Sequence, residues 1–193
     1  MAEPPDTKPT LFRLALHHTP SPVDPEGAAE LYQAIGTLIV AWGRLETHFL
    51  ACIIAILQIP STKGLSRKLP NAWDERTKIW KDAFRISPDL KPYETTALQF
   101  LDEMQNVAEL RNIIVHGLWE EFSAGPPVSA QVIRIKRRKD LPGGLEFFKS
   151  DPLTPRLVRS ATQKASDLNI GLQTLSSILT ALRGPLPPNV HII

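Results

Sequence analysis

Prolines divide this sequence into segments, and only the segments between them can form long helices. A proline inside a helix removes a backbone hydrogen bond and clashes with the preceding turn. The chain has 18 prolines, and six of them fall within residues 1–25. Pro60 and Pro88 each follow a stretch of helical spacing, whereas Pro155 suits the first turn of a new helix. The prolines therefore predict an extended N-terminal arm over 1–25, followed by separate helices.

Four helical segments are predicted between this arm and a second proline-containing tail at 185–193. Each carries apolar residues at the spacing of an amphipathic helix, and each ends near a proline or a glycine. Gly117, after the third segment, suits a left-handed cap position. We expect the helices at 26–57, 71–86, 91–116 and from Thr154-Pro155 to just before Gly184.

Residues 118–150 interrupt the helical pattern. The runs LWEEFS, VSAQVIRI and GLEFFKS read as strands around turns, and three strands are viable when they pack on helices. The sequence thus predicts a mainly α fold, with one domain over 26–184. We expect a four-helix up-and-down bundle with a small antiparallel β insertion, 118–150, between helices three and four.

Cysteine usage and hydropathy limit the class of protein. The single cysteine, Cys52, excludes an intrachain disulfide framework and a zinc site built on cysteine ligands, and reads as a small buried hydrophobe. The longest hydrophobic stretch, 38–57, is interrupted by Arg44, Glu46 and His48, so we expect no membrane span. The N-terminus lacks the apolar segment of a secretory signal. We therefore expect a cytoplasmic protein.

Two charged residues fall on faces that are otherwise apolar when the helices are drawn at about 100° per residue. Glu46 lies inside the apolar face of the first helix, and Arg111 lies near the centre of that of the third. A buried unpaired charge costs several kcal/mol. In one interpretation Glu46 and Arg111 pair across the bundle. In the other, which is compatible with the first, Arg111 faces a polar cleft.

The surroundings of Arg111 favour the cleft. Asn112 and His116 are four residues apart and share one helix face, where the amide can fix the tautomer of the ring. Arg111 lies about 140° round the helix from His116, but its long side chain can reach round, or a second copy of the chain can supply it. A lone helical histidine is more often structural than catalytic. This combination predicts a site made of Arg111, Asn112 and His116.

These residues carry a family resemblance. Arg111-Asn112-x-x-x-His116 is similar to the signature of the HEPN superfamily (higher eukaryote and prokaryote nucleotide-binding domain). The run Trp42-Gly43-Arg44-Leu45-Glu46 also resembles the start of some HEPN-like bundles. The resemblance covers residues 28–120 and, by pattern alone, the fourth helix. The insertion and the arm match no general pattern of the family.

The resemblance implies a homodimer that sets two motifs across one cleft, and a metal-independent endoribonuclease of a toxin–antitoxin or defence system. It gives His116 the role of acid or base, Arg111 that of phosphate binder and Asn112 that of an orienting residue. Glu46, from the helical wheel and not from the resemblance, is the expected supporting partner of Arg111. The partners expected are RNA, a second copy, and an antitoxin or other defence protein. The alternative is a non-catalytic HEPN-like binding or scaffold module of such a complex.

A basic run follows in the insertion, but the net charge of +2 does not by itself indicate nucleic acid. We expect mainly a solvated strand end there. The second interpretation is an edge that contacts RNA phosphates. The residues concerned are Arg134, Lys136, Arg137, Arg138 and Lys139. We expect no metal and no cofactor, because no phosphate loop or paired-carboxylate pattern occurs and His17-His18 has no acidic or cysteine neighbour.

Overall fold

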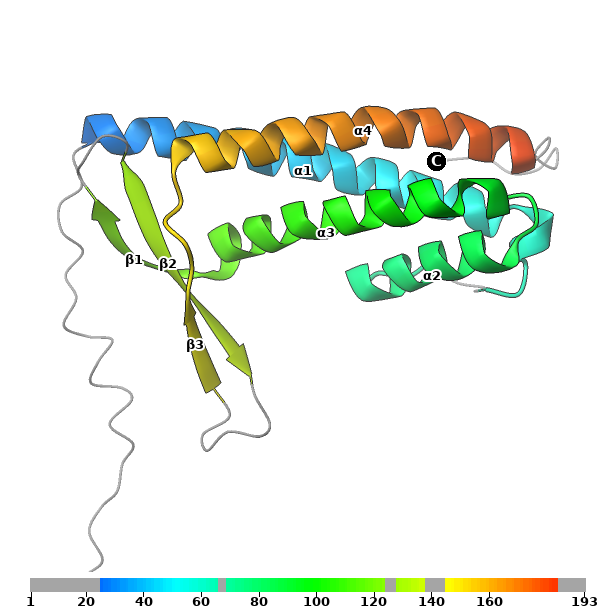
Figure 1. Ribbon diagram of the computed structural model, residues 1–193, viewed down its shortest axis with the longest axis horizontal. Helices are drawn as coiled ribbons and strands as arrows, with labels where there is room; N and C mark the ends of the chain where they lie inside the picture. The colour runs from blue at the N-terminus through cyan, green and yellow to red at the C-terminus, as the bar shows by residue number, and fades with distance from the viewer. Residues whose placement is uncertain (1–24, 66–68, 124–127, 138–144, 184–193) are drawn as a thin grey trace, which may run out of the picture.

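The computed structural model describes residues 25–65, 69–123, 128–137 and 145–183. The predicted tail and all but Pro25 of the predicted arm lie outside these residues. Four α-helices dominate the fold, so the prediction of a mainly helical chain is confirmed (Figure 1). The helices are α1 (Pro25–Leu57), α2 (Trp73–Ile86), α3 (Glu94–His116) and α4 (Pro155–Arg183), with short 3₁₀ turns at Pro60–Thr62 and Lys91–Tyr93.

The two longest helices, α1 and α4, lie side by side and run in the same direction (Figure 1). Near their N-terminal ends, Glu30 of α1 forms an ion pair with Arg159 of α4. At the other end, Arg183 of α4 donates a 2.9 Å hydrogen bond to Gln58, just after α1. The number of residues between the two contacting partners is nearly the same at both ends of α1 and α4, as expected for helices that pack in parallel.

Helix α2 also runs parallel to α1, so the expectation of an up-and-down bundle is wrong. Ser61 and Ser87, which follow the C-terminal ends of α1 and α2, are joined by a 2.6 Å hydrogen bond between their hydroxyls. In an up-and-down bundle these two ends would lie at opposite ends of the molecule. Only α3 runs antiparallel to the other three helices (Figure 1).

The connection between α1 and α2 explains this topology. Instead of turning directly into α2, the chain after α1 is anchored by Ile59 and Thr62, both fully buried. It is fixed again at Pro70, whose carbonyl accepts a 3.0 Å hydrogen bond from Nε of Arg76. Helix α2 therefore begins beside the middle of α1 and runs toward the same end.

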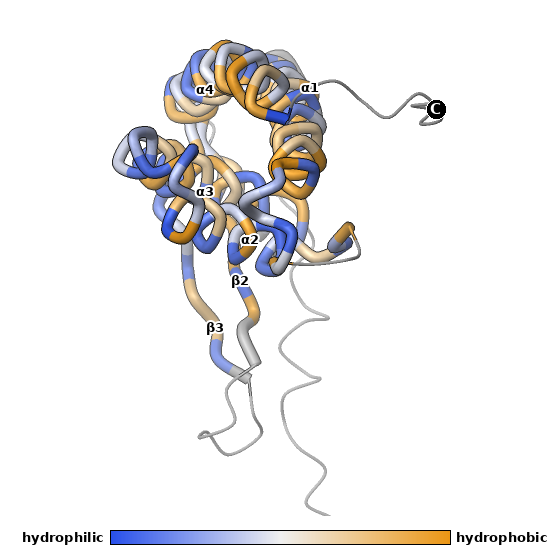
Figure 2. Tube along the Cα trace, turned by 90° about the vertical axis from the view of Figure 1, so that its right-hand side faces the viewer, coloured by the Kyte–Doolittle hydropathy of each residue, from blue (hydrophilic) through white to orange (hydrophobic). Residues whose placement is uncertain are grey.

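The core lies between the four helices, which Figure 2 shows end-on. Its α2 side is aromatic: Phe49 contacts both Trp73 and Trp80 with ring centroids 5.1 Å apart. The indole of the fully buried Trp80 donates a 2.8 Å hydrogen bond to the carbonyl of Ala97, so its polar atom is satisfied. This cluster holds α2 against α1 and α3, and therefore fixes the position of the first turn of α2.

Helix α1 supplies the largest share of the core from one face. By length and composition, its residues 28–57 also meet the criterion for a helix that can cross a membrane, a criterion that a core helix of a soluble protein meets equally well. Cys52 lies fully buried on this face, as expected. Burial raises the pKa of its thiol to about 12, so the side chain behaves as a small hydrophobe.

The predicted β insertion is confirmed as a three-stranded antiparallel sheet in the order β1-β2-β3. It projects from the end of the bundle at which α3 stops and α4 begins (Figure 1). The register places Arg134 of β2 opposite Phe148 of β3. The strands are β1 (Leu118–Ser123), β2 (Ser129–Arg137) and β3 (Leu145–Lys149).

Gly117 joins α3 to the sheet, but not in the left-handed conformation expected. Its φ of −83° and ψ of 156° are extended values that any residue adopts. The requirement for glycine is steric, since a Cβ atom there would lie 2.1 Å from Cγ1 of Val132 and 2.5 Å from the carbonyl oxygen of Ile113. Gly117 therefore allows β2 to pack closely against the end of α3, next to His116.

Candidate functional site

A stripe of polar residues runs along one face of α3. Positions 102, 105, 109 and 112 are spaced three or four apart, and with their neighbours they line a cavity of about 680 Å³, which we call the α3 groove. Its α3 lining includes Asp102, Gln105, Asn106, Glu109, Arg111 and Asn112. The rest of the lining consists of Trp42 and Glu46 from α1, Trp73 and Asp74 from α2, and Arg134 from β2, together with Ala108.

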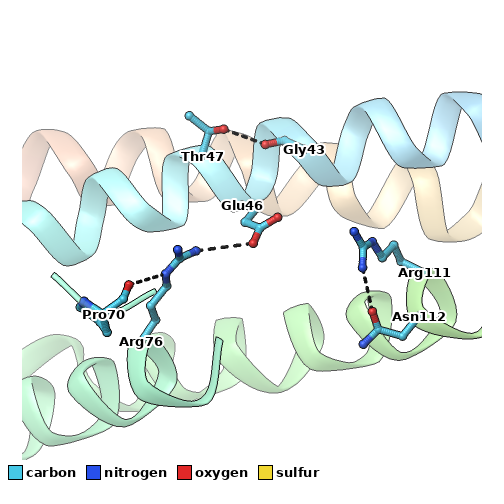
Figure 3. Close-up of polar contacts among 7 residues, drawn as sticks. All are labelled: Gly43, Glu46, Thr47, Pro70, Arg76, Arg111 and Asn112. Carbon is cyan, nitrogen blue, oxygen red and sulfur yellow. Dashed lines mark hydrogen bonds and ion pairs between the residues drawn. The ribbon is translucent and has the colours of Figure 1, made fainter. Parts of the chain in front are cut away.

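Arg111 is the centre of the predicted motif. Its Nη1 donates a 3.0 Å hydrogen bond to Oδ1 of Asn112 and lies 3.5 Å from Nε2 of His116. The first of these contacts is drawn in Figure 3. Nε of Arg111 is buried and has no hydrogen-bond partner within the part of the chain that the structure describes. One chain thus brings the three predicted residues together, and the guanidinium retains unused donor capacity.

His116 ends α3 and is exposed, one turn beyond Asn112 on the same helix face. It is not part of the groove lining, so it stands just outside the end formed by Asn112. A guanidinium offers only donors. Arg111 can therefore donate a hydrogen bond across this 3.5 Å contact only to an Nε2 that carries no proton. In this arrangement Nε2 is the ring nitrogen able to accept a proton.

Glu46 does not form its ion pair with Arg111, as one interpretation of the sequence predicted, but with another arginine. Oε1 of Glu46 lies 3.5 Å from Nη1 of Arg76 on α2 (Figure 3). The reason is the parallel course of α2, which brings its first turn beside the middle of α1. The Glu46 side chain is 41% exposed and that of Arg76 only 13%, so the arginine is the more buried partner. Glu46 still lines the groove.

Arg76 was missed in the sequence, although a signal for it exists. It lies three residues after Trp73 and four before Trp80, and so shares their core-facing side of α2. A charged residue between two aromatic residues at helical spacing needs a partner, by the reasoning applied above to Arg111. Drawing α2 on the same helical wheel would have identified it.

Only part of the predicted basic run is found at the groove. Arg134 lines it, and no hydrogen bond or ion pair of its side chain is found within the described residues. Lys136 and Arg137 lie further along β2, away from the bundle. Arg138 and Lys139 fall outside the described residues. Arg134 is therefore the member of the run that lies with Arg111.

Charge is distributed unevenly along the α3 groove. Glu46, Asp74, Asp102 and Glu109 carry carboxylates, while Arg111 and Arg134 carry the positive charge. Asp102 lies nine residues before Arg111, about 13 Å along the helix axis. Among the charged lining residues, Asp74 and Asp102 lie toward α2 and both arginines lie toward the sheet, with Glu46 (Figure 3) and Glu109 between them. Among the described residues no three or more His, Cys, Asp or Glu side chains are grouped as a metal ion would need.

Comparison with known proteins adds no assignment. No protein-family model matches the chain, and neither a curated protein nor a solved structure matches it. The resemblance to the HEPN superfamily therefore stays a prediction from the motif.

Proposed function

We propose that this protein is a metal-independent endoribonuclease of the HEPN type. The observation that supports it most is the contact of one arginine, Arg111, with both Asn112 and His116 at the exposed end of α3. A positioned histidine beside an arginine supplies the two functions that RNA cleavage at a ribose needs: proton transfer and stabilisation of phosphate charge.

The proposed reaction uses the 2′-hydroxyl of the RNA itself. His116 takes the proton of this hydroxyl through Nε2, and the 2′-oxygen attacks the adjacent phosphorus. The bond from phosphorus to the 5′-oxygen breaks, and that oxygen leaves with a proton from a second acid. The products are a 2′,3′-cyclic phosphate and a 5′-hydroxyl. Arg111 stabilises the charge on the phosphate oxygens through its planar fork.

Binding of the substrate phosphate would also free Nε2 of His116 to act as the general base. In the free protein, Arg111 occupies the lone pair of Nε2 through the 3.5 Å contact, which is long for a hydrogen bond. A phosphate is a stronger acceptor for a guanidinium than a neutral ring nitrogen. When Arg111 turns to the phosphate, Nε2 becomes free to accept the 2′-hydroxyl proton. Asn112 then keeps the guanidinium oriented.

The second acid comes from a second copy in this proposal. Next to His116, the sheet exposes apolar side chains on one face, which we call the sheet-face patch. It consists of the exposed Leu118, Ile135 and Phe147 with the half-buried Ile133, placed together by the pairings of Leu118 with Ile133 and of Ile135 with Phe147. Exposed apolar patches mark association surfaces. A dimer across this patch would bring two His116 side chains into proximity.

One observation favours the alternative, a binding module without catalysis. Carboxylates outnumber arginines in the lining of the α3 groove, and they repel the phosphates of a long RNA. In a binding module the groove would hold a smaller or less anionic ligand, and the Arg111–His116 contact would be structural. The exposure of His116 and the ion pair of Glu46 with Arg76, which leaves Arg111 at the groove, favour the enzyme.

RNA cleavage in the presence of EDTA tests the proposal. The full chain incubated with total RNA plus EDTA should produce fragments with cyclic phosphate and 5′-hydroxyl ends, and a DNA copy of the same sequence should stay intact. Complete inhibition by EDTA, or cleavage of the DNA, would assign a different nuclease mechanism. A parent protein that cuts no RNA would favour the binding module.

A further inference from the structure

The uneven charge of the α3 groove restricts what can lie in it along its length. An anionic group is favoured beside Arg111 and Arg134 and disfavoured beside Asp74 and Asp102. A ligand that fills the groove must therefore be anionic at one end and offer hydrogen-bond donors at the other. A nucleotide has this construction, with its phosphate at one end and the edge of its base at the other.

The middle of the groove suits a ribose. Asn106 and Glu109 lie on α3 between Asp102 and Arg111, and both line the cavity. An amide and a carboxylate together can donate to and accept from sugar hydroxyls. The cavity volume of about 680 Å³ lies within the range of small-molecule sites, about 300–1,000 Å³. Base, ribose and phosphate can thus be accommodated in one line.

Trp73 gives the end beside Asp74 and Asp102 an aromatic surface. It lines the groove and is only half-buried, so part of its ring is open to a ligand. Its other contacts, with Trp42 at 5.4 Å and Phe49 at 5.1 Å between ring centroids, hold it in place. Stacking on a fixed aromatic ring is the common way in which proteins bind an unpaired base.

The carboxylates at this end select among bases. A carboxylate only accepts hydrogen bonds. Guanine presents two adjacent donors, its N1–H and its 2-amino group, to a single carboxylate, whereas uracil presents one donor between two carbonyl oxygens. Asp102 lines the groove, and it also borders a second cavity on the α2 side together with Thr77, Lys78 and Lys81. Asp74 lies at the N-terminus of that helix.

We infer that the α3 groove binds a guanosine nucleotide, with the base between Trp73 and the carboxylates of Asp74 and Asp102 and the phosphate at Arg111 and Arg134. The inference rests on the proposed function, because the phosphate bound by Arg111 and Arg134 is taken to be the one at which His116 acts. In RNA, the guanosine would be the nucleotide next to the bond that is cut. The groove would thereby give the enzyme a base preference.

Calorimetric titration of the full chain with mononucleotides tests the inference without any cleavage, because a mononucleotide has no phosphodiester bond to cut. Guanosine monophosphate should bind at least about tenfold more tightly than uridine monophosphate, the difference expected for one charge-assisted hydrogen bond. Inosine monophosphate, which lacks the 2-amino group, should fall between them. Equal affinity for all three would overturn the inference, and this comparison needs no variant.

Variants locate the site. Asp74→Asn with Asp102→Asn should reduce the affinity for guanosine monophosphate to that for uridine monophosphate, while Arg111→Ala should weaken both alike. Glu75→Gln removes a negative charge from a neighbouring residue that does not line the groove. It should change the affinity for neither nucleotide. A guanosine preference that survives the double replacement in a folded protein would overturn the assignment to this groove.

The outcomes separate the two proposals. Guanosine binding without RNA cleavage would refute the ribonuclease and leave the nucleotide site intact. RNA cleavage without any preference in mononucleotide binding would refute the guanosine site and leave the ribonuclease proposal intact.

Discussion

Nη1 of Arg111 lies 3.5 Å from Nε2 of His116, although the two residues are about 140° apart around α3. The length of the arginine side chain closes this angle, and Asn112 holds the guanidinium with a 3.0 Å hydrogen bond. A composite site made from two chains is therefore not needed to bring arginine and histidine together. In the proposed mechanism the second copy contributes its histidine.

Arg111→Lys should separate the role of charge from that of geometry. Lysine keeps the positive charge, but it lacks the planar fork that faces Asn112, His116 and a phosphate together. Loss of one preorganised donor of this kind typically costs about 10²–10³ in rate. We expect RNA cleavage to fall by that order with an unchanged melting temperature. Arg85→Lys, on the exposed side of α2, is the matched control and should retain full activity.

Glu46→Ala should destabilise the fold modestly, because Arg76 loses its partner. A fully buried pair would lose about 3–5 kcal/mol, but Glu46 is 41% exposed and the contact is long, so about 0.5–1 kcal/mol is expected. Denaturant unfolding in a double-mutant cycle measures the coupling. Glu46 and Arg76 should be coupled, whereas Glu46 and Arg111 should be additive. Coupling to Arg111 alone would show that the ion pair has been assigned to the wrong arginine.

Gly117→Ala should destabilise the protein by about 1–3 kcal/mol, because the new methyl group would collide with Val132 and with the carbonyl of Ile113. Gly43→Ala is the control on an exposed face of α1, where nothing lies within 4 Å of the added atom. It should stabilise by about 0.5–1 kcal/mol through better helix propensity. Thermal unfolding of both variants measures the contrast. Equal effects would mean that β2 does not pack closely on Gly117.

Leu118→Arg should dissociate the proposed dimer. It places a charge within the sheet-face patch, two residues from His116, at a side chain that is 56% exposed and so is not needed for the core. Light scattering at micromolar concentration should show a dimer for the parent and a monomer for the variant, which should also lose RNA cleavage. A monomeric parent that cleaves RNA would remove the second copy from the mechanism.

Much of the fold could be predicted, because local signals determine it. Periodicity and proline placement gave the four helices, and Thr154 caps α4 through a 3.2 Å hydrogen bond from the backbone N–H of Leu157. The direction of α2 could not be predicted. It depends on the packing of Ile59, Thr62 and Pro70 in the preceding connection, which leaves no periodic trace in the sequence.

The site was predictable in part for the same reason. Arg111, Asn112 and His116 lie on one helix, so their proximity follows from spacing alone. The partner of Glu46 depends on how two helices align, and that alignment follows from the unexpected course of α2. Arg134 reaches the groove only through the packing of β2 on the end of α3. A sequence pattern identifies charges that need partners, whereas tertiary packing decides which partners they find.

The most direct test of the proposed function is the single-turnover rate of RNA cleavage by the parent and by His116→Ala, measured in EDTA. We predict a loss of about 10²–10⁴ in rate for the variant, because it removes a positioned acid–base group. Its melting temperature should not change, since His116 is exposed. A folded His116→Ala protein that cleaves RNA at the parental rate would contradict the account.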